Sequence, residues 1–399
     1  MRGVAFDFVP MGRRVTRDPY PTYDRMREAG RILTTSYGAT LVHRYDDVRQ
    51  VHLDHDAFSM GAGQGPMAPS GEGMGGSEFM MAQTMLTADP PDHERLRRVV
   101  NRAFTPRSIA DLEPRVREIC RQLLAPLAAG EPFDIVAEFA APLPTIVIAE
   151  LLGIPAEDGP KFREWTESIT GTDVRGRTDP GRAQEFGREL REYLGEQIER
   201  RKTAPTDDLI GRMVEANGEQ IMSDAEVVAS CVLLLIAGNE TTMRLITNMT
   251  LALGRHPDQL AVLSDDPSVI PSAIEETLRY DSPVQMLFRG VKRPVEIGGV
   301  ELGTGQMVLT MLAAANRDPD AFVDADVYDV TRAENLHVSL GHGIHYCLGA
   351  PLARRETRIA FEELLDAVPR FELVTHDDEL EYPPMLLLRS PRSLVVRPA

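Results

Sequence analysis

One cysteine, Cys347, lies in the segment that most constrains how this chain can fold. Gly341 and Gly343 precede the sulfur, Gly349 follows it, and a helix-forming stretch begins directly afterwards. Glycine permits positive φ angles and lets the backbone approach a flat object closely. A cysteine at the head of a helix has its thiolate favoured by the helix macrodipole and by unpaired amide N–H groups. The pattern predicts a thiolate held against a planar metal macrocycle, as in haem proteins that cleave O–O bonds.

The alternative for any single cysteine is a small buried hydrophobic residue. The other two cysteines, Cys120 and Cys231, are far away in the chain, so the three give no disulfide framework. This usage is typical of a reducing cytosol. The first residues, Met1-Arg-Gly-Val-Ala-Phe-Asp, have no sustained apolar region like that of a signal peptide. We therefore expect a cytoplasmic protein.

The composition allows a large buried core, because 43% of the 399 residues are hydrophobic. Helical periodicity dominates residues 88–285, and the interruptions are short turns. Strand-like runs lie at 32–35, 40–43, 295–297, 307–310 and 394–396. There is no internal repeat and no linker long enough to separate domains. We expect a mainly α fold with small β-sheets, forming one large domain over residues 1–399.

The charge of the chain limits its partners. A net charge of −18 argues against nucleic acid. The longest apolar stretch, residues 227–238, is too short to span a bilayer, so we expect no membrane association. Arginines nevertheless cluster locally. This cluster is either a solvated face without a partner or a docking surface for a small acidic electron carrier. They are Arg95, Arg97, Arg98, Arg102, Arg107, Arg354 and Arg355.

A long central helix is predicted after Ser223. Ser223-Asp-Ala-Glu226 is a capping-box pattern, and apolar periodicity continues to Gly254, with Pro257 as a stop signal. The helix would contain about 30 residues and be about 45 Å long.

The centre of this helix places Leu233, Ala237 and Thr241 on one face. Ala237 and Gly238 are small enough to leave room for a diatomic ligand, which Thr241 could hydrogen-bond. Glu240 could relay protons from solvent. The alternative is a helix that only exposes a polar face here, with its threonines bonded back to carbonyl groups.

Together, the cysteine run and the central helix resemble the cytochrome P450 family. The Gly-x-Gly-x-His-x-Cys-x-Gly spacing is similar to the family's haem-binding signature, and Ala237-Gly-Asn-Glu-Thr241 is similar to its proton-delivery motif. The resemblance covers nearly the whole chain. It implies haem b with an axial thiolate from Cys347, between the central helix and the helix after the cysteine, in a triangular domain. Residues expected against the cofactor are Ala237, Gly238, Leu340, Gly341 and Gly349.

Leu340 is a departure, because the family usually has Phe at this position beside the sulfur. Leucine keeps an apolar shield, so the resemblance still implies ligation by Cys347. Redox potential and thiolate exposure are the properties that this departure puts in question.

The resemblance also implies which residues hold the cofactor. Haem propionates need cationic or hydrogen-bonding partners. His93 and Arg97 share a helix face, and the family places further partners at Arg289 and His337. His345 is a weaker candidate.

Glu276 and Arg279 match the family's buried Glu-x-x-Arg motif, with Arg332 as a third, structural partner. The alternative for such a pair on a helix is a surface ion pair that contributes little stability.

The resemblance implies a monooxygenase that uses dioxygen, with Glu240 and Thr241 in catalytic roles. Electrons would come from NAD(P)H through a ferredoxin reductase and a ferredoxin, as separate proteins, because this chain has no flavin or iron–sulfur motif. One alternative is a hydrogen-peroxide-dependent peroxygenase, which the intact Glu–Thr pair disfavours. Another is a non-catalytic haem-thiolate sensor or carrier. We expect a monomer.

The substrate is the least constrained feature. The expected pocket is mostly aliphatic, which favours a neutral lipophilic molecule such as a terpenoid, steroid, fatty acyl chain or polyketide. A Gly- and Met-rich loop at 59–77 is expected to act as an adaptable lid. The other expected lining is residues 162–186, Leu233, Ala237, Val284, Met286, Met385 and Leu386.

Overall fold

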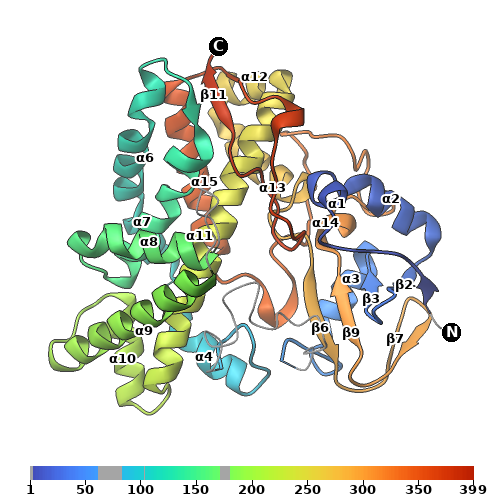
Figure 1. Cartoon of the computed structure of the whole chain (residues 1–399), viewed down its shortest axis with the longest axis horizontal. Coiled ribbons are helices and arrows are strands. Elements are labelled where there is room, and N and C mark those ends of the chain that lie inside the picture. The colour runs from blue at the N-terminus through green and yellow to red at the C-terminus, as the bar shows by residue number, and fades with distance from the viewer. Residues whose placement is uncertain (1–2, 62–82, 103, 171–179) are drawn as a thin grey trace.

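The computed structural model describes residues 3–61, 83–102, 104–170 and 180–399. Most of the expected lid, and residues 171–179 of the expected pocket segment, lie outside these described residues. Helices gather on the left of Figure 1 and the main sheet lies on the right. The expectation of a mainly α fold with small sheets is confirmed.

The helical part is built around α11 (Asp224–Arg255), which crosses it from bottom to top in Figure 1. This helix packs against helices that lie before and after it in the chain, namely α7, α9, α10, α13 and α15. The helices of this part are α4 (Asp92–Asn101), α5 (Pro106–Asp111), α6 (Glu113–Ala128), α7 (Pro142–Leu152), α8 (Gly159–Thr170), α9 (Pro180–Thr203), α10 (Leu209–Gly218), α12 (Pro257–Asp265), α13 (Ile270–Tyr280) and α15 (Ala350–Ala367).

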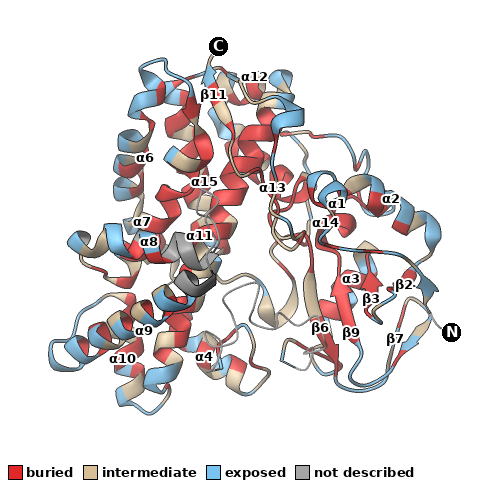
Figure 2. Cartoon of the chain, viewed as in Figure 1, coloured by how far each residue is buried: buried red, intermediate tan, exposed pale blue. Residues whose placement is uncertain are grey.

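The start of α11 is confirmed as predicted. Ser223 accepts a hydrogen bond from the amide of Glu226, whose side chain accepts one from the Ser223 amide, which completes a capping box. Among the described helices, α11 alone is long and apolar enough to cross a membrane, but 61% of its apolar window is buried within the protein. It is therefore the core helix of the fold (Figure 2).

The sheet part is a six-stranded sheet of order β1-β2-β3-β9-β6-β4. Its strands are β1 (Val4–Ala5), β2 (Ile32–Thr34), β3 (Thr40–Val42), β4 (Phe58–Ser59), β6 (Leu287–Val291) and β9 (Met307–Thr310). Helices α1 (Arg13–Arg17), α2 (Tyr20–Ala29), α3 (Tyr45–Leu53) and α14 (Leu312–Ala315) lie in the same part. Two smaller sheets contain β7 (Val295–Ile297) with β8 (Val300–Leu302), and β5 (Phe133–Asp134) with β10 (Phe371–Leu373) and β11 (Val395–Pro398).

Strand β6 was not among the predicted strands, yet it carries a site residue. It pairs antiparallel with β9, with Arg289 opposite Val308 and Leu287 opposite Thr310. Because side chains alternate along a strand, Leu287 and Arg289 share one face of the sheet and Phe288 points to the other. The strands β2, β3 and β9, which contain only apolar residues and threonine, were predicted correctly, whereas the arginine and glycine inside β6 hid its pattern.

Candidate functional site

A stripe of accessible residues, which we call the open stripe, runs along the centre of α11 and is the expected wall of the substrate cleft. Most of this helix is buried, but Leu233 and Ile236 are half-buried, Ala237 is exposed, and Gly238 and Thr241 are again half-buried. These positions recur three to four residues apart, so they form one continuous stripe. The sequence predicted this face from Leu233, Ala237 and Thr241, and Ile236 is an additional member.

The cysteine loop carries the predicted ligand. Gly341 and Gly343 have φ angles of 71° and 70°. A Cβ at Gly343 would lie 2.4 Å from the carbonyl oxygen of His52, so only glycine fits there. The amide of Cys347 donates to the carbonyl of Leu340 at 2.8 Å, which closes the loop. Residues 342–349 stay exposed or half-buried although α13 and α15 around them form core.

Gly349 has an ordinary φ of −77°, and no protein atom lies within 4 Å of a Cβ built on it. The described protein therefore leaves space beside this glycine, as expected for a residue against the cofactor. Leu340 is half-buried and packs against the core that α6, α11, α13 and α15 share.

Opposing influences act on the pKa of the Cys347 thiol in the protein alone. Burial raises the pKa of the Cys347 thiol, and the amides of Gly349 and Ala350 and the charge of Arg97 only partly oppose it. A bound metal cation deprotonates a coordinating thiol outright, so ligation rather than the helix would supply the thiolate.

Two arginines near the loop, the buried Arg289 and the half-buried Arg97, form no ion pair with a carboxylate among the described residues. Arg289 is 4% exposed, and burial lowers its pKa to about 10, with only a partial compensation from Asp89. Burial also lowers the pKa of Arg97, whose guanidinium donates to the carbonyl of Tyr346 at 2.6 Å. Buried cations of this kind require an anion.

His93 completes the same cluster. It is buried, and neither ring nitrogen has a hydrogen-bond partner among the described residues. Its ring centroid lies 4.4 Å from that of His345. Unsatisfied buried nitrogens beside two cationic side chains fit an anion with several oxygen acceptors. The two propionates of haem provide that chemistry, so the residues present fit the cofactor.

His337 was predicted to bind a propionate, and its contacts contradict that role. Its Nε2 lies 3.1 Å from a carboxylate oxygen of Glu275, and its Nδ1 accepts from the amide of Ser339 at 3.3 Å. Glu275 also accepts two hydrogen bonds from Arg354, at 2.6 and 2.7 Å. Both ring nitrogens of His337 are thus occupied, and His345 is the better candidate. The sequence signal that could have identified His345 is its position two residues before Cys347.

The polar pair on α11 shows a more constrained geometry than the sequence suggested. The Thr241 hydroxyl donates to the carbonyl of Ala237 at 2.7 Å, which is the back-bonded arrangement. It still lies on the open stripe of the helix. Glu240 is buried, and its carboxylate accepts a hydrogen bond from Arg244, one turn further along the helix.

The Glu276–Arg279 pair is fully buried, as the resemblance implied. Arg279 donates twice to the carboxylate, at 2.7 Å each, and Arg332 donates once at 3.0 Å. Arg332 and Arg279 also donate to backbone carbonyls of the segment at 316–327. The three residues therefore fasten the irregular segment before the cysteine loop to α13.

Two of the expected pocket residues are core residues instead. Met286 and Leu386 are each 1% exposed and belong to the same hydrophobic cluster of the sheet part. Val284 and Met385 are half-buried, and Val284 forms a β-bridge with the half-buried Leu388.

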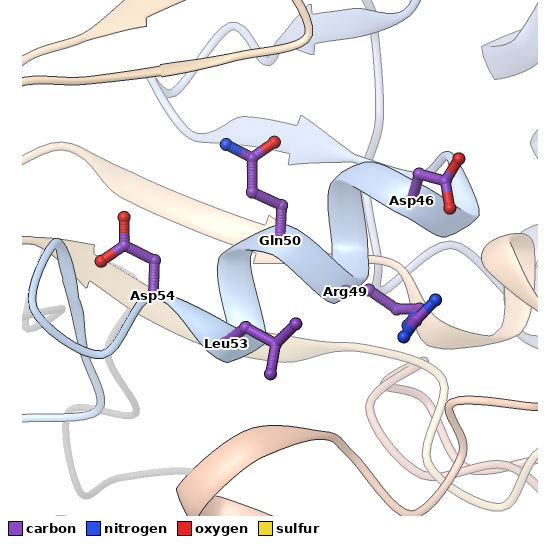
Figure 3. A pocket seen from close by; sticks show the side chains of 5 residues that line it. All are labelled: Asp46, Arg49, Gln50, Leu53 and Asp54. Carbon is purple, nitrogen blue, oxygen red and sulfur yellow. The ribbon is translucent and has the colours of Figure 1, made fainter.

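A separate hollow lies on the outside of α3, with a volume of about 450 Å³. Figure 3 shows its lining, which comes from successive turns of α3 and the residue that follows the helix. The lining residues are Asp46, Arg49, Gln50, Leu53 and Asp54. It contains none of the residues described above and is open to solvent. We assign the site to the open stripe of α11 and the cysteine loop, and not to this hollow.

A glycine-rich cysteine loop, an open stripe on a long core helix, and arginines and a buried histidine near the loop that lack a carboxylate partner among the described residues are together the features expected of a haem-thiolate protein. The chain belongs to the cytochrome P450 family. The family model "Cytochrome P450" matches residues 268–396. The chain is 40% identical to cytochrome P450 107B1 of Saccharopolyspora erythraea over 98% of each chain. It is 40% identical to vitamin D(3) 25-hydroxylase of Pseudonocardia autotrophica, covering 94% of this chain and 92% of the relative.

A similar solved structure is cytochrome P450 CYP109Q5 from Chondromyces apiculatus. It superposes with a TM-score of 0.89 at 36% identity, covering 99% of this chain and 98% of that one. The protein is accordingly a haem-containing cytochrome P450 monooxygenase of the bacterial type, with Cys347 as the cysteine of the family signature.

Proposed function

We propose that this cytochrome P450 takes electrons from NAD(P)H through separate ferredoxin reductase and ferredoxin proteins and hydroxylates or epoxidises a neutral lipophilic molecule. The whole chain, residues 1–399, would act as one monomeric domain in the cytoplasm. The observation that carries the proposal is the open stripe of α11, which presents Ala237 and Thr241 in a helix that is otherwise core.

When bound, haem supplies the activation of dioxygen. The protein groups then hold and move protons. The Thr241 hydroxyl is fixed by its bond to the carbonyl of Ala237, so its oxygen is free to accept a hydrogen bond from within the cleft. Glu240, the adjacent residue, is the acid that would return protons to this hydroxyl.

The proposed docking surface for the electron carrier lies on α4 and α5. Part of the arginine cluster is neutralised, since Arg95 binds Glu226 and Arg355 binds Glu113. Arg98, Arg102 and Arg107 are exposed, and none forms an ion pair with a described residue. Exposed cations that form no ion pair with a described residue, in the helix that also carries Arg97 and just after it, suit a small acidic protein, because complementary charge steers the encounter.

The substrate class rests on the aliphatic character of the cleft. Leu233, Ile236, Val284 and Leu388 are half-buried and carry no charge. The similarity to a vitamin D(3) hydroxylase supports a neutral lipophilic substrate, within the terpenoid, steroid, fatty acyl and polyketide range. Titrating the ferric protein with such compounds should shift the Soret band to shorter wavelength for the class that binds.

Replacing Thr241 by Ala tests the proposed function. The variant should bind haem and give a normal carbon monoxide difference spectrum, but it should lose at least about tenfold in product formed per NADPH, with peroxide released instead. Thr250→Ala is the matched control, because Thr250 makes the same type of back-bond, to Ile246 at 2.9 Å, in the buried part of α11. Equal product per NADPH in the two variants would contradict the role of Thr241.

The same assay separates the alternatives. A peroxygenase would form product from hydrogen peroxide alone as efficiently as with NADPH and ferredoxin. A sensor or carrier would bind the compound and oxidise no NADPH in its presence. Neither alternative has a described residue that favours it over the monooxygenase.

A further inference from the structure

A buried ion pair lies inside α11, one turn beyond the stripe that faces the cleft. Arg244 and Glu240 are in direct contact, and their side chains are only 6% and 10% exposed. An ion pair at positions i and i+4 of a helix is usually on the surface and contributes little. Here both charges are removed from water, so each depends on the other for compensation.

The guanidinium of Arg244 is fixed by a second contact. Its other terminal nitrogen donates to the hydroxyl of Ser390 at 3.1 Å. One turn further along, the Asn248 amide donates to the carbonyls of Asp281 and Arg389, at 2.9 and 3.0 Å. Arg244 and Asn248 thus anchor this face of α11 to the C-terminal segment. These contacts hold the Arg244 side chain inside the protein.

The pair restricts what Glu240 can do. Arginine is always charged and has no acceptor, so it can hold a carboxylate by its planar fork but cannot pass a proton on. The hydrogen bond from Arg244 engages one carboxylate oxygen of Glu240. Arg244 therefore determines where the carboxylate lies, while the proton must arrive on the oxygen that Arg244 does not hold.

We propose that Arg244 is a positioning residue for proton delivery: it holds the Glu240 carboxylate beside Thr241, and the Ser390 contact holds Arg244 in turn. The inference rests on the proposed function, because it assumes that Glu240 supplies protons to the cleft. The hydrogen bonds of Arg244 among the described residues go to Glu240 and Ser390, so we treat it as a positioning residue and not as a catalytic one.

The first test compares two ways of driving the reaction. Arg244→Gln should lower the rate of NADPH-driven product formation by about tenfold or more, because a misplaced catalytic group costs that much. Product formation driven by added hydrogen peroxide should stay near the wild-type rate, since peroxide brings its own protons. Arg244→Lys, which keeps a charge, should recover part of the NADPH-driven rate. A merely structural role would lower both rates together.

The second test does not use activity. The thermal unfolding midpoint of the ferric holoprotein is measured for wild type, Glu240→Gln, Arg244→Gln and the double variant. Removing one partner of a buried pair leaves an uncompensated charge, so Arg244→Gln should lower the midpoint, and the double variant should recover part of that loss. The carbon monoxide spectrum of each variant confirms that the cysteine still binds haem.

Two results would overturn the inference: equal losses in NADPH-driven and peroxide-driven rates, or midpoint changes that simply add. In a Glu240→Gln background, Arg244→Gln should cause no further loss of NADPH-driven rate, and a further tenfold loss would also contradict it. Failure of the proposed function is distinguishable, because wild type itself would then form no product from NADPH and ferredoxin. The inference would fall with it.

Discussion

Glu276 is the residue whose replacement should most clearly separate structure from catalysis. Its carboxylate is fully buried and accepts five hydrogen bonds. One oxygen accepts from Arg279 and from the amide of Asp329, and the other accepts from Arg279, Arg332 and Asn335. In Glu276→Gln, whichever oxygen becomes an NH₂ group, at least two donors lose their acceptor and two arginines lose their counter-charge.

The magnitude follows from these contacts. Breaking a buried ion pair by removing one partner costs about 3–5 kcal/mol. The entropy of unfolding near the thermal unfolding midpoint is about 2.1 cal/mol/K per residue, which gives about 0.8 kcal/mol/K for 399 residues. The midpoint of Glu276→Gln should therefore fall by about 4–6 °C.

Differential scanning calorimetry of the holoprotein, followed at the Soret band for haem loss, measures this change. Glu372→Gln is the matched control, because Glu372 pairs with Arg397 and both side chains are about half exposed, at 49% and 57%. A surface pair contributes about 0–1 kcal/mol, so the control should shift by about 1 °C or less. If Glu276→Gln shifted no more than the control, the three-residue network would not stabilise the fold as argued.

Two further predictions concern charge. Arg98→Glu and Arg102→Glu should each raise the KM for ferredoxin about tenfold at low salt, with the difference shrinking as salt screens it, while the peroxide-driven rate stays unchanged. Equal KM values in titrations at low salt would place the docking surface elsewhere. Burial lowers the pKa of His43 to about 4, and its Nε2 lies 2.9 Å from the carbonyl of Gly30. The unfolded chain therefore binds more protons than the folded protein between about pH 6.5 and 4, so stability falls as pH is lowered through that window, by up to about 3 kcal/mol. His43→Gln should flatten this slope in denaturant titrations at pH 7, 6 and 5, and an unchanged slope would count against His43 as its source.

The local sequence determined the parts of the site that lie on single elements. The capping box, the apolar period and the stop signal defined α11 to within one residue of its observed end. The glycines around Cys347 defined a loop that the positive φ angles at Gly341 and Gly343 bear out. Both features depend on neighbours in the chain, and backbone preferences of this kind are visible without tertiary contacts.

Only the tertiary structure decided which charged groups meet. The sequence interpretation placed His337 ahead of His345 as a propionate partner, but Glu275 on α13 occupies His337. Packing decided that Met286, just before β6, enters the sheet core, while Arg289 inside β6 is buried without a carboxylate partner among the described residues. The contact between Arg244 and Ser390 joins residues that are far apart in the chain. Long-range pairings of this kind are set by packing between elements, and the sequence around each residue does not encode them.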